Sequence, residues 1–268
     1  MQTKMFSFGL FAVSAFLWHV VSGADRVSVS AMEGDSVTLY TDVKINQQEK
    51  ICCYFNGTRI AQISGDLHHI CTDVLCKGSD ERFRDRLKLD NQTGSLTITN
   101  ITNTDSGLYK LLILRSSSDS ETIFNIVIGV SAAELCEVKK RKSVTLDPGV
   151  IKHPIDSMTW YFNDTCITEI TGNQSKICTD DQWDERFRDR MEVNQTGFLT
   201  ITNTRTTDSG LYKLQIHSRR FSITRSFRVT VTGGGDYKDA RVPSSGKPDF
   251  LFRDTINLCD LIQDIYKG

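Results

Sequence analysis

The sequence offers little that points to a membrane, to nucleic acid or to catalysis. The longest uninterrupted apolar run in its C-terminal tail is Phe250–Phe252, far short of the roughly 20 residues that cross a bilayer. The net charge is −1 and acidic residues are interleaved with basic ones, so the basic stripe that nucleic acid requires is missing. The motifs G-x-S-x-G, H-E-x-x-H and the P-loop are also absent. We therefore expect no enzyme, no cofactor, no nucleic-acid partner and no membrane insertion of the mature chain.

Residues 1–23 have the character of a secretory signal rather than of a folded segment. Lys4 supplies a positive start, residues 6–21 are nearly all apolar, and Ser22 and Gly23 are small residues beside a cleavage point. Such a segment is too short and wrongly flanked to remain as an anchor. We expect a secreted, extracellular chain in an environment where disulfides persist, with related forms anchored to the plasma membrane.

One long phrase occurs twice in the chain, at a spacing of a little over 100 residues. Its parts are ERFRDR at 81–86 and 185–190, NQTG at 91–94 and 194–197, LTITN at 96–100 and 199–203, and TDSGLYKL at 104–111 and 207–214. A repeat of this length is a duplicated domain rather than a short solenoid unit. We predict a signal peptide at 1–23, domains at 24–129 and 130–232, and a largely disordered tail at 233–268 without a transmembrane segment.

Both repeats are predicted to consist of short strands. In the first repeat, alternating or β-branched patterns occur at Ser36–Tyr40, Leu87–Leu89, Ser95–Thr99 and Tyr109–Leu114. Many short strands with turn residues about every 8–12 positions indicate an all-β sandwich or barrel. The phrase ERFRDR is interpreted as a solvated strand edge with a structural ion pair, because charge runs of mixed sign usually form exposed faces.

The choice of a sandwich rests on the motif D-S-G-L-Y at 105–109 and its copy at 208–212. This motif, with an arginine-led strand about 20 residues upstream, resembles the immunoglobulin superfamily, V-set branch. The resemblance covers about residues 25–129 and 134–232 and implies two tandem immunoglobulin-like V-type sandwiches. It also implies structural roles for the ion pairs Arg86–Asp105 and Arg190–Asp208 (with Arg82 and Arg186 as alternative partners), the corner residues Tyr109 and Tyr212, and the core residue Trp160.

Neither repeat has the cysteine pair that usually joins the two sheets in this family. The family's positions are Thr41 and Leu111 in the first repeat, and Pro148 and Leu214 in the second. The first repeat also has Cys53 where the family places its tryptophan. The missing bridge removes about 4 kcal/mol in the chain-entropy model. We expect packed aliphatic side chains or other disulfides to offset this loss.

Eight cysteines remain for other pairings. Cys166 and Cys178 flank a predicted C′–C″ hairpin, and we predict that they form a disulfide. Cys71 has Cys52, Cys53 and Cys76 as alternative partners, among which the sequence does not choose. For Cys136 and Cys259 three alternatives stay open: pairing with each other, bridging two chains, or remaining free.

A zinc site is the alternative reading of the first repeat's cysteines. Cys52 and Cys53 together with His68, His69, Cys71 and Cys76 have suitable ligand types. The oxidising compartment and the lack of histidine at 175–179 favour disulfides. We therefore expect no metal.

Six glycosylation sequons agree with secretion. Asn56 and Asn163 occupy matching positions in the two repeats, as do Asn91 and Asn194. We predict glycans on these four asparagines.

The strand at 109–114 differs between the repeats on its outward face. Because side chains alternate along a strand, inward positions 109, 111 and 113 leave Lys110, Leu112 and Leu114 outward, on the GFCC′C″ face. The second repeat has Lys213, Gln215 and His217 at these positions. We expect Tyr54 to face the same way. Exposed leucines predict a partner-binding surface, and the alternative is that a long C′–C″ segment covers them.

Two V-like domains behind a signal, with RLKLDNQTGSLTI before DSGLY, resemble the signalling lymphocytic activation molecule (SLAM) family, and in particular its fish immune-type relatives. The resemblance implies recognition of a cell-surface immunoglobulin-family protein, including a second copy of the chain, through the GFCC′C″ face of the first domain. The second domain departs from the family pattern because it is another V-like copy. The alternative function is a secreted structural or effector protein, dimerised through Cys136 or Cys259.

Overall fold

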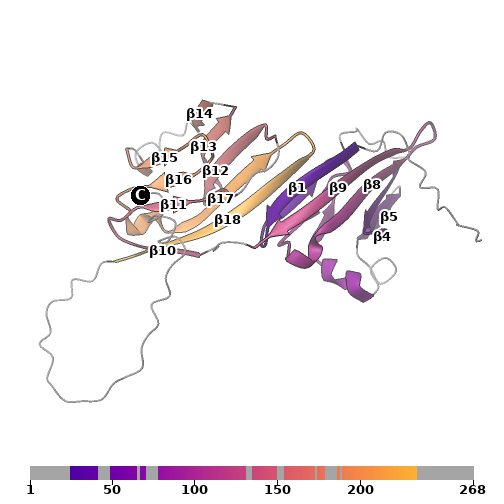
Figure 1. The fold of residues 1–268 in the computed structure, drawn as a ribbon, viewed down its shortest axis with the longest axis horizontal. Helices are drawn as coiled ribbons and strands as arrows, with labels where there is room; N and C mark the ends of the chain where they lie inside the picture. The colour runs from indigo at the N-terminus through magenta and orange to yellow at the C-terminus, as the bar shows by residue number, and fades with distance from the viewer. Residues whose placement is uncertain are drawn as a thin grey trace, which may run out of the picture.

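The computed structural model describes residues 25–41, 49–64, 67–70, 78–130, 135–149, 154–172, 174–178, 186–187 and 189–233. The predicted signal peptide and the tail beyond residue 233 lie outside these ranges. The described chain is built almost entirely of strands, with short 3-10 turns between them (Figure 1). None of its helices has the length and apolar character needed to span a membrane. The predicted all-β fold of two tandem V-type sandwiches is confirmed.

Repeat 1 comprises the first nine strands. In chain order these are β1 (Asp25–Met32), β2 (Ser36–Leu39), β3 (Lys50–Phe55), β4 (Thr58–Ser64), β5 (Leu67–Ile70), β6 (Leu87–Leu89), β7 (Leu96–Ile98), β8 (Gly107–Leu114) and β9 (Ser120–Gly129). The 3-10 helices η1 (Gly78–Phe83) and η2 (Asn103–Asp105) precede β6 and β8.

Repeat 2 comprises the next nine strands and matches repeat 1 strand for strand. These are β10 (Leu135–Lys139), β11 (Val144–Leu146), β12 (Ser157–Phe162), β13 (Thr165–Thr171), β14 (Gln174–Ile177), β15 (Met191–Val193), β16 (Leu199–Ile201), β17 (Gly210–His217) and β18 (Phe221–Thr232). The 3-10 helix η3 (Thr206–Asp208) precedes β17, as η2 precedes β8.

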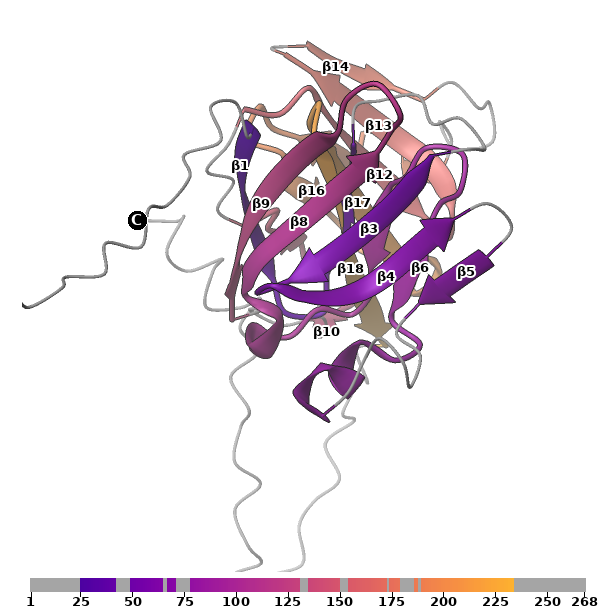
Figure 2. The same ribbon diagram turned by 90° about the vertical axis from the view of Figure 1, so that its right-hand side faces the viewer.

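Each repeat has the two sheets of a V-type sandwich. The front sheet of repeat 1 has the order β1-β9-β8-β3-β4-β5, which is A′GFCC′C″, and its back sheet is β2-β7-β6, which is BED. Repeat 2 has β18, β17, β12, β13 and β14 in its front sheet, with β10 beside β18, and β11-β16-β15 as its back sheet. Figure 2 looks onto the front sheet of repeat 1, with repeat 2 behind it.

The two repeats share one nine-stranded sheet, which sequence reasoning did not predict. Strand β18 pairs with β2 in antiparallel register from Phe221↔Leu39 to Thr224↔Ser36, so the front sheet of repeat 2 continues into the back sheet of repeat 1. Strand β10 pairs only with the second half of β18, from Arg228 to Thr232, and leaves its first half to β2. In repeat 1, by contrast, β1 covers the matching strand β9 from Thr122 to Gly129. The short first strand of repeat 2 therefore creates the edge that joins the repeats.

A buried ion pair lies at this junction. Arg225 on β18 donates from Nε to Asp35 Oδ1 at 2.9 Å and from Nη2 to Asp35 Oδ2 at 2.7 Å. Its Nη1 donates to the carbonyl of Pro148, and the amide of Met32 donates to Asp35 Oδ2. Both charged side chains are almost fully buried. A buried charge is tolerated only when it is paired and hydrogen-bonded, so this pair ties the two repeats together in a fixed geometry.

Apolar side chains form one continuous core through both repeats. The inward residues of β2, such as Val37, lie on the same face of the shared sheet as their β18 neighbours, such as Ile223. Repeat 1 covers this face with its front sheet and repeat 2 covers it with its back sheet. Leu111 and Leu214, at the family's cysteine positions, are fully buried in this core.

The prediction that ERFRDR forms a strand edge is wrong. In repeat 1 its first residues belong to η1, and the chain turns before β6 begins at Leu87. Phe83 and its counterpart Phe187 are buried in the core. Phe83 packs edge-to-face on Phe55 with ring centroids 5.1 Å apart. Each copy of this charged phrase therefore contains one phenylalanine that packs in the core.

The arginine and aspartate of each motif meet at the base of each sandwich. Arg86 Nη1 lies 2.8 Å from Asp105 Oδ2, and Arg190 Nη1 lies 2.8 Å from Asp208 Oδ2. The alternative partner Arg82 donates instead to the carbonyl of Thr104. Each aspartate also accepts the amide three residues before it, which fixes the 3-10 turn leading into the following strand.

The corner tyrosines complete these bases. The hydroxyl of Tyr109 donates to the Asp105 carbonyl at 2.8 Å, and that of Tyr212 to the Asp208 carbonyl at 2.9 Å. Trp160 is likewise buried, and its Nε1 donates to the Gly197 carbonyl.

We expect the chain to lose stability in alkali because of these tyrosines. Burial, together with the neighbouring aspartate, raises the pKa of Tyr109 and of Tyr212 above the ordinary value of about 10. A raised pKa favours the protonated folded state, so this contribution is complete below pH 10 and declines as the pH rises above it. Urea unfolding between pH 8 and 11 should show the decline. Tyr109→Phe should cost about 1 kcal/mol at pH 8 and weaken the pH dependence, and an unchanged dependence would contradict this.

The structure contains the predicted disulfide between Cys166 and Cys178, whose Cα atoms are 5.8 Å apart. Cys136 is also disulfide-bonded, so it does not remain free. Cys52 and Cys53 are buried and form no disulfide, which removes them as partners of Cys71. Burial raises the pKa of the Cys53 thiol and keeps it protonated beside Leu111, which faces it across the strand pair.

Candidate functional site

The predicted partner-binding residues lie together on the outer face of the front sheet of repeat 1. Along β8, Tyr109, Leu111 and Ile113 are buried, whereas the alternate residues Leu112 and Leu114 are only partly buried. Strand β3 lies beside β8, with Tyr54 opposite Lys110. The alternation expected for strand F is therefore present, and the two leucines are accessible in part.

Tyr54 and Lys110 form the polar centre of this face. The Lys110 ammonium lies 5.1 Å from the centroid of the Tyr54 ring, and 3.5 Å from Glu121 Oε2 on the neighbouring strand β9. The pKa of Tyr54 is raised by burial above its ordinary value of about 10, so the hydroxyl is protonated at neutral pH, as in any tyrosine, and can donate a hydrogen bond. At the end of β8, Arg115 pairs with Glu49 at 2.8 Å.

Strand β9 extends the apolar surface, which sequence reasoning missed. Ile123 is the register partner of Lys110 and points outward, and Val127 further along β9 is 56% exposed. Leu108 at the start of β8 is 53% exposed. A comparison of the two G strands would have found the difference, because the register partner of Lys213 in repeat 2 is Ser226. We call Tyr54, Leu108, Lys110, Leu112, Leu114, Ile123 and Val127 the front patch.

Repeat 2 has the same fold and keeps a leucine, Leu211, at the position of Leu108, but it lacks most of the other apolar residues of the front patch. Gln215, His217 and Ser226 stand at the positions of Leu112, Leu114 and Ile123. Its lysine is retained, and Lys213 Nζ lies 2.6 Å from Asp164 Oδ1. The fold therefore does not require Leu112, Leu114 and Ile123 on this face, and these three apolar residues distinguish repeat 1 from repeat 2.

The two recurrent asparagines at the C–C′ turns have a structural task. Asn56 and Asn163 adopt positive φ, and their Oδ1 atoms accept the amides of Leu108 and Leu211. At Gly107, φ is +155° and a Cβ atom would lie 2.7 Å from Asn56 Oδ1, so only glycine fits there. The recurrence of Asn56 and Asn163 at matching positions thus has a structural reason, apart from glycosylation.

The other pair, Asn91 and Asn194, lies exposed at the D–E turns. Glycosylation of all four asparagines stays a prediction.

Within the described residues, no group of three or more histidine, cysteine, aspartate or glutamate side chains could hold a metal ion. Cys71 and Cys76 of the zinc alternative lie outside them, as do the side chains of His68 and His69.

Comparison with known proteins finds structural likeness but no relative by sequence. No protein-family model matches the chain, and no curated protein matches it. A solved structure of the two tandem V-type regions of VCBP3, a V-region-containing chitin-binding protein, is 12% identical, with 78% of this chain and 98% of that chain covered and a TM-score of 0.35.

Two further structures are similarly distant. Sidekick-1 immunoglobulin domains 1–5 are 12% identical over 79% of this chain and 39% of that chain, with a TM-score of 0.30. The CD2-binding domain of CD58 is 13% identical over 76% of this chain and 98% of that chain, with a TM-score of 0.32. TM-scores this low do not by themselves assign a fold. The strand order and the tyrosine corners do so, and they show that this chain is a tandem of two V-type immunoglobulin-like sandwiches.

Proposed function

We propose that this protein is an extracellular recognition protein of the immune type that binds an immunoglobulin-family protein on a cell surface through the front patch of repeat 1. The observation that carries the proposal is the contrast between the repeats: Leu112, Leu114 and Ile123 face outward where repeat 2 has polar residues. Partly exposed apolar clusters around a polar centre mark contact surfaces more often than unused ones.

The junction between the repeats supports this choice of face. Strand β18 of repeat 2 occupies the edge of β2, so the back sheet of repeat 1 adjoins repeat 2. The front sheet of repeat 1 lies on the other side of the core and faces away from repeat 2 (Figure 2). With six strands against the three of the back sheet, it is the larger sheet surface of repeat 1, and a partner can approach it without separating the repeats.

The resemblance to the SLAM family supports a partner of the same fold, including a second copy of the chain. The expected signal at 1–23 supports secretion, so the protein would act as a soluble competitor for a cell-bound receptor. The alternative of a covalent dimer through Cys136 is disfavoured, because this cysteine is buried and already disulfide-bonded.

Leu112→Asp and Leu114→Asp should each weaken binding at least tenfold, because a charge placed in a desolvated contact costs more than about 1.4 kcal/mol. Self-association is measured by sedimentation of the full chain, and binding to other partners by staining leukocytes with the tagged chain.

Gln215→Asp and His217→Asp are the matched controls, since they place the same charge at the same strand positions of repeat 2. They should leave binding within twofold of the original chain. Equal binding by all four variants would rule out the front patch as the recognition surface.

A further inference from the structure

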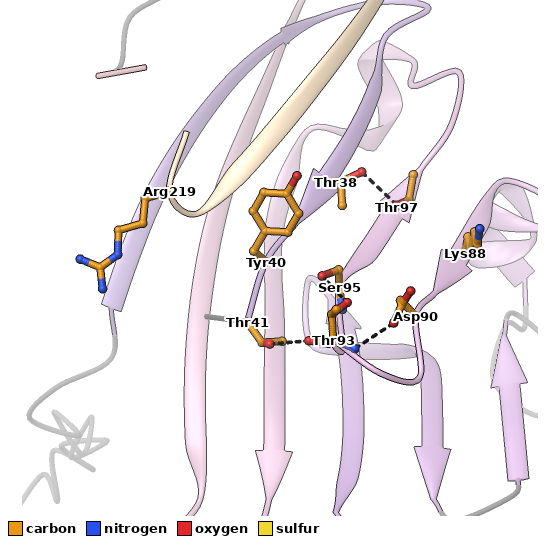
Figure 3. Close-up of a pocket in the computed structure, with 9 residues that line it drawn as sticks. All are labelled: Thr38, Tyr40, Thr41, Lys88, Asp90, Thr93, Ser95, Thr97 and Arg219. Carbon is orange, nitrogen blue, oxygen red and sulfur yellow. Dashed lines mark hydrogen bonds between the residues drawn. The ribbon is translucent and has the colours of Figure 1, made fainter. Parts of the chain in front are cut away.

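A polar cleft of about 470 Å³ opens beside the junction of the repeats, on the outer face of the shared sheet (Figure 3). Most of its lining comes from β2, β6 and β7 of repeat 1 and the turns that follow them, and Arg219 comes from the turn between β17 and β18 of repeat 2. The lining residues are Thr38, Tyr40, Thr41, Lys88, Asp90, Thr93, Ser95, Thr97 and Arg219. The cleft lies on the opposite layer from the front patch and plays no part in the proposed function.

Hydroxyl groups dominate this lining. Thr38 Oγ1 lies 2.9 Å from Thr97 Oγ1, and Thr93 Oγ1 lies 2.8 Å from Ser95 Oγ. Tyr40 donates its hydroxyl proton to Ser222 Oγ at 2.8 Å. Each hydroxyl has one donor and two acceptor sites, so groups paired in this way keep capacity for a ligand. The Tyr40 side chain adds an apolar ring surface to the polar floor (Figure 3).

The charges of the cleft favour an anion. Lys88 and Arg219 are exposed cations on its rim, and Asp90 is its one acidic lining residue. The Asp90 carboxylate accepts the amides of Gln92 and Thr93, both at 2.8 Å, and these bonds lower its pKa. Its charge is thus partly used within the turn. A lysine side chain such as that of Lys88 can reach a bound carboxylate or sulfate.

Repeat 2 shows that the fold does not dictate this chemistry. Its sheet repeats the threonine pair, with Thr145 Oγ1 and Thr200 Oγ1 3.0 Å apart. By register, Glu192 replaces Lys88, whereas Asp147, Pro148 and Phe198 stand in place of Tyr40, Thr41 and Ser95. The hydroxyl-rich, cationic cleft is therefore specific to repeat 1 and to its junction with repeat 2.

We propose that this cleft binds an anionic saccharide, a sugar that carries a carboxylate or sulfate group. Its volume lies in the range of small-ligand sites, and convergent hydroxyls match the donors and acceptors of a sugar. Tyr40 offers a ring for the apolar face of a pyranose, and Lys88 and Arg219, at opposite ends of the lining, each place a cation within reach of an acidic group at that end (Figure 3).

Two sources could supply such a saccharide. The predicted glycan on Asn91 would start at the rim, because Asp90 and Thr93 on either side of this asparagine line the cleft. A glycan on another molecule would present the same chemistry. Both sources require the same binding groups, and removal of the sequon separates them.

The test uses the full chain with Asn91→Gln, so that no glycan at this position fills the cleft. Saturation-transfer NMR with 3′-sialyllactose should show binding, and lactose should bind at least fivefold more weakly. Thr38→Val with Thr97→Val should lower the affinity for sialyllactose about tenfold, as expected for two lost hydrogen bonds. The matched control, Thr145→Val with Thr200→Val, should leave it unchanged. Lys88→Glu, on an exposed position, should remove the preference for sialyllactose over lactose.

The chain with its natural sequon identifies the source. Weaker sialyllactose binding than in the Asn91→Gln chain, with slower sialidase cleavage at Asn91 than at Asn194, would show that the chain's own glycan occupies the cleft. Equal binding by the two chains would show that the saccharide comes from another molecule. No saturation transfer in the Asn91→Gln chain, or equal transfer after the Thr38 and Thr97 substitutions, would overturn the proposal.

Discussion

Arg225→Ala should lower the free energy of unfolding of the full chain by about 3–5 kcal/mol, the cost typical of breaking a buried ion pair. The substitution leaves the Asp35 carboxylate inside the protein without its two guanidinium hydrogen bonds. It also removes the donor to the Pro148 carbonyl. Because these groups belong to different repeats, the loss weakens the junction as well as the core. Urea denaturation followed by tryptophan fluorescence measures the change.

Two comparisons separate the ion pair from the loss of a long side chain. Arg228→Ala removes an exposed arginine three residues further along β18 and should change stability by less than about 0.5 kcal/mol. Asp35→Leu combined with Arg225→Leu should recover most of the loss, since paired apolar replacements avoid an uncompensated charge. Equal effects of Arg225→Ala and Arg228→Ala would refute a special role for the pair.

Asp208→Ala should cost a similar amount, about 3–5 kcal/mol, because it leaves Arg190 unpaired at the base of repeat 2. Asp208 also accepts the Arg205 amide, which starts the turn into β17. The same change at Asp105 in repeat 1 should cost less, since the Arg86 side chain is 19% exposed and that of Arg190 only 7%. Water can hydrate an arginine that reaches the surface.

Chemical denaturation of the two variants tests this order. Asp156→Ala, which removes an exposed carboxylate of repeat 2, is the control and should be nearly neutral. A larger loss for Asp105→Ala than for Asp208→Ala would contradict the link between burial and the strength of the clasp.

Local patterns predicted short strands in a sandwich or barrel, and the resemblance carried by the D-S-G-L-Y motifs decided for the sandwich. The D-S-G-L-Y motifs predicted where strand F starts and which arginine pairs with the motif's aspartate. The alternation of side chains then predicted which residues of β8 face inward and which face outward. The phrase ERFRDR misled because five of its six residues are charged, which outweighed the one buried phenylalanine in the pattern. Boundaries between short elements depend on such single anchors.

The junction of the repeats was out of reach of the same reasoning. Strands β2 and β18 are far apart in the chain, and their pairing depends on the exposed edge that the short strand β10 leaves. One signal was present in β18. Arg225 stands among apolar inward residues, between Ile223 and Phe227, where a charge requires a buried partner. The sequence did not identify Asp35 as that partner.

The front patch was predicted in part. Leu112 and Leu114 were found from strand F, whereas Ile123 and Val127 were missed because strand G was not compared between the repeats. The cleft beside the junction could not be predicted, since Arg219 reaches it only through the pairing of β18 with β2. The functional roles of both surfaces rest on the experiments proposed for them.

Hydrogen exchange at the amide of Tyr40 tests the shared sheet most directly. This amide donates to the carbonyl of Arg220, a residue of the other repeat, at 2.9 Å. If the repeats form one continuous sheet, the Tyr40 amide exchanges slowly in the full chain and becomes fast when Arg225→Ala loosens the junction. Fast exchange of this amide in the unaltered chain, at the rate of an open loop, would contradict the sheet that joins the two repeats.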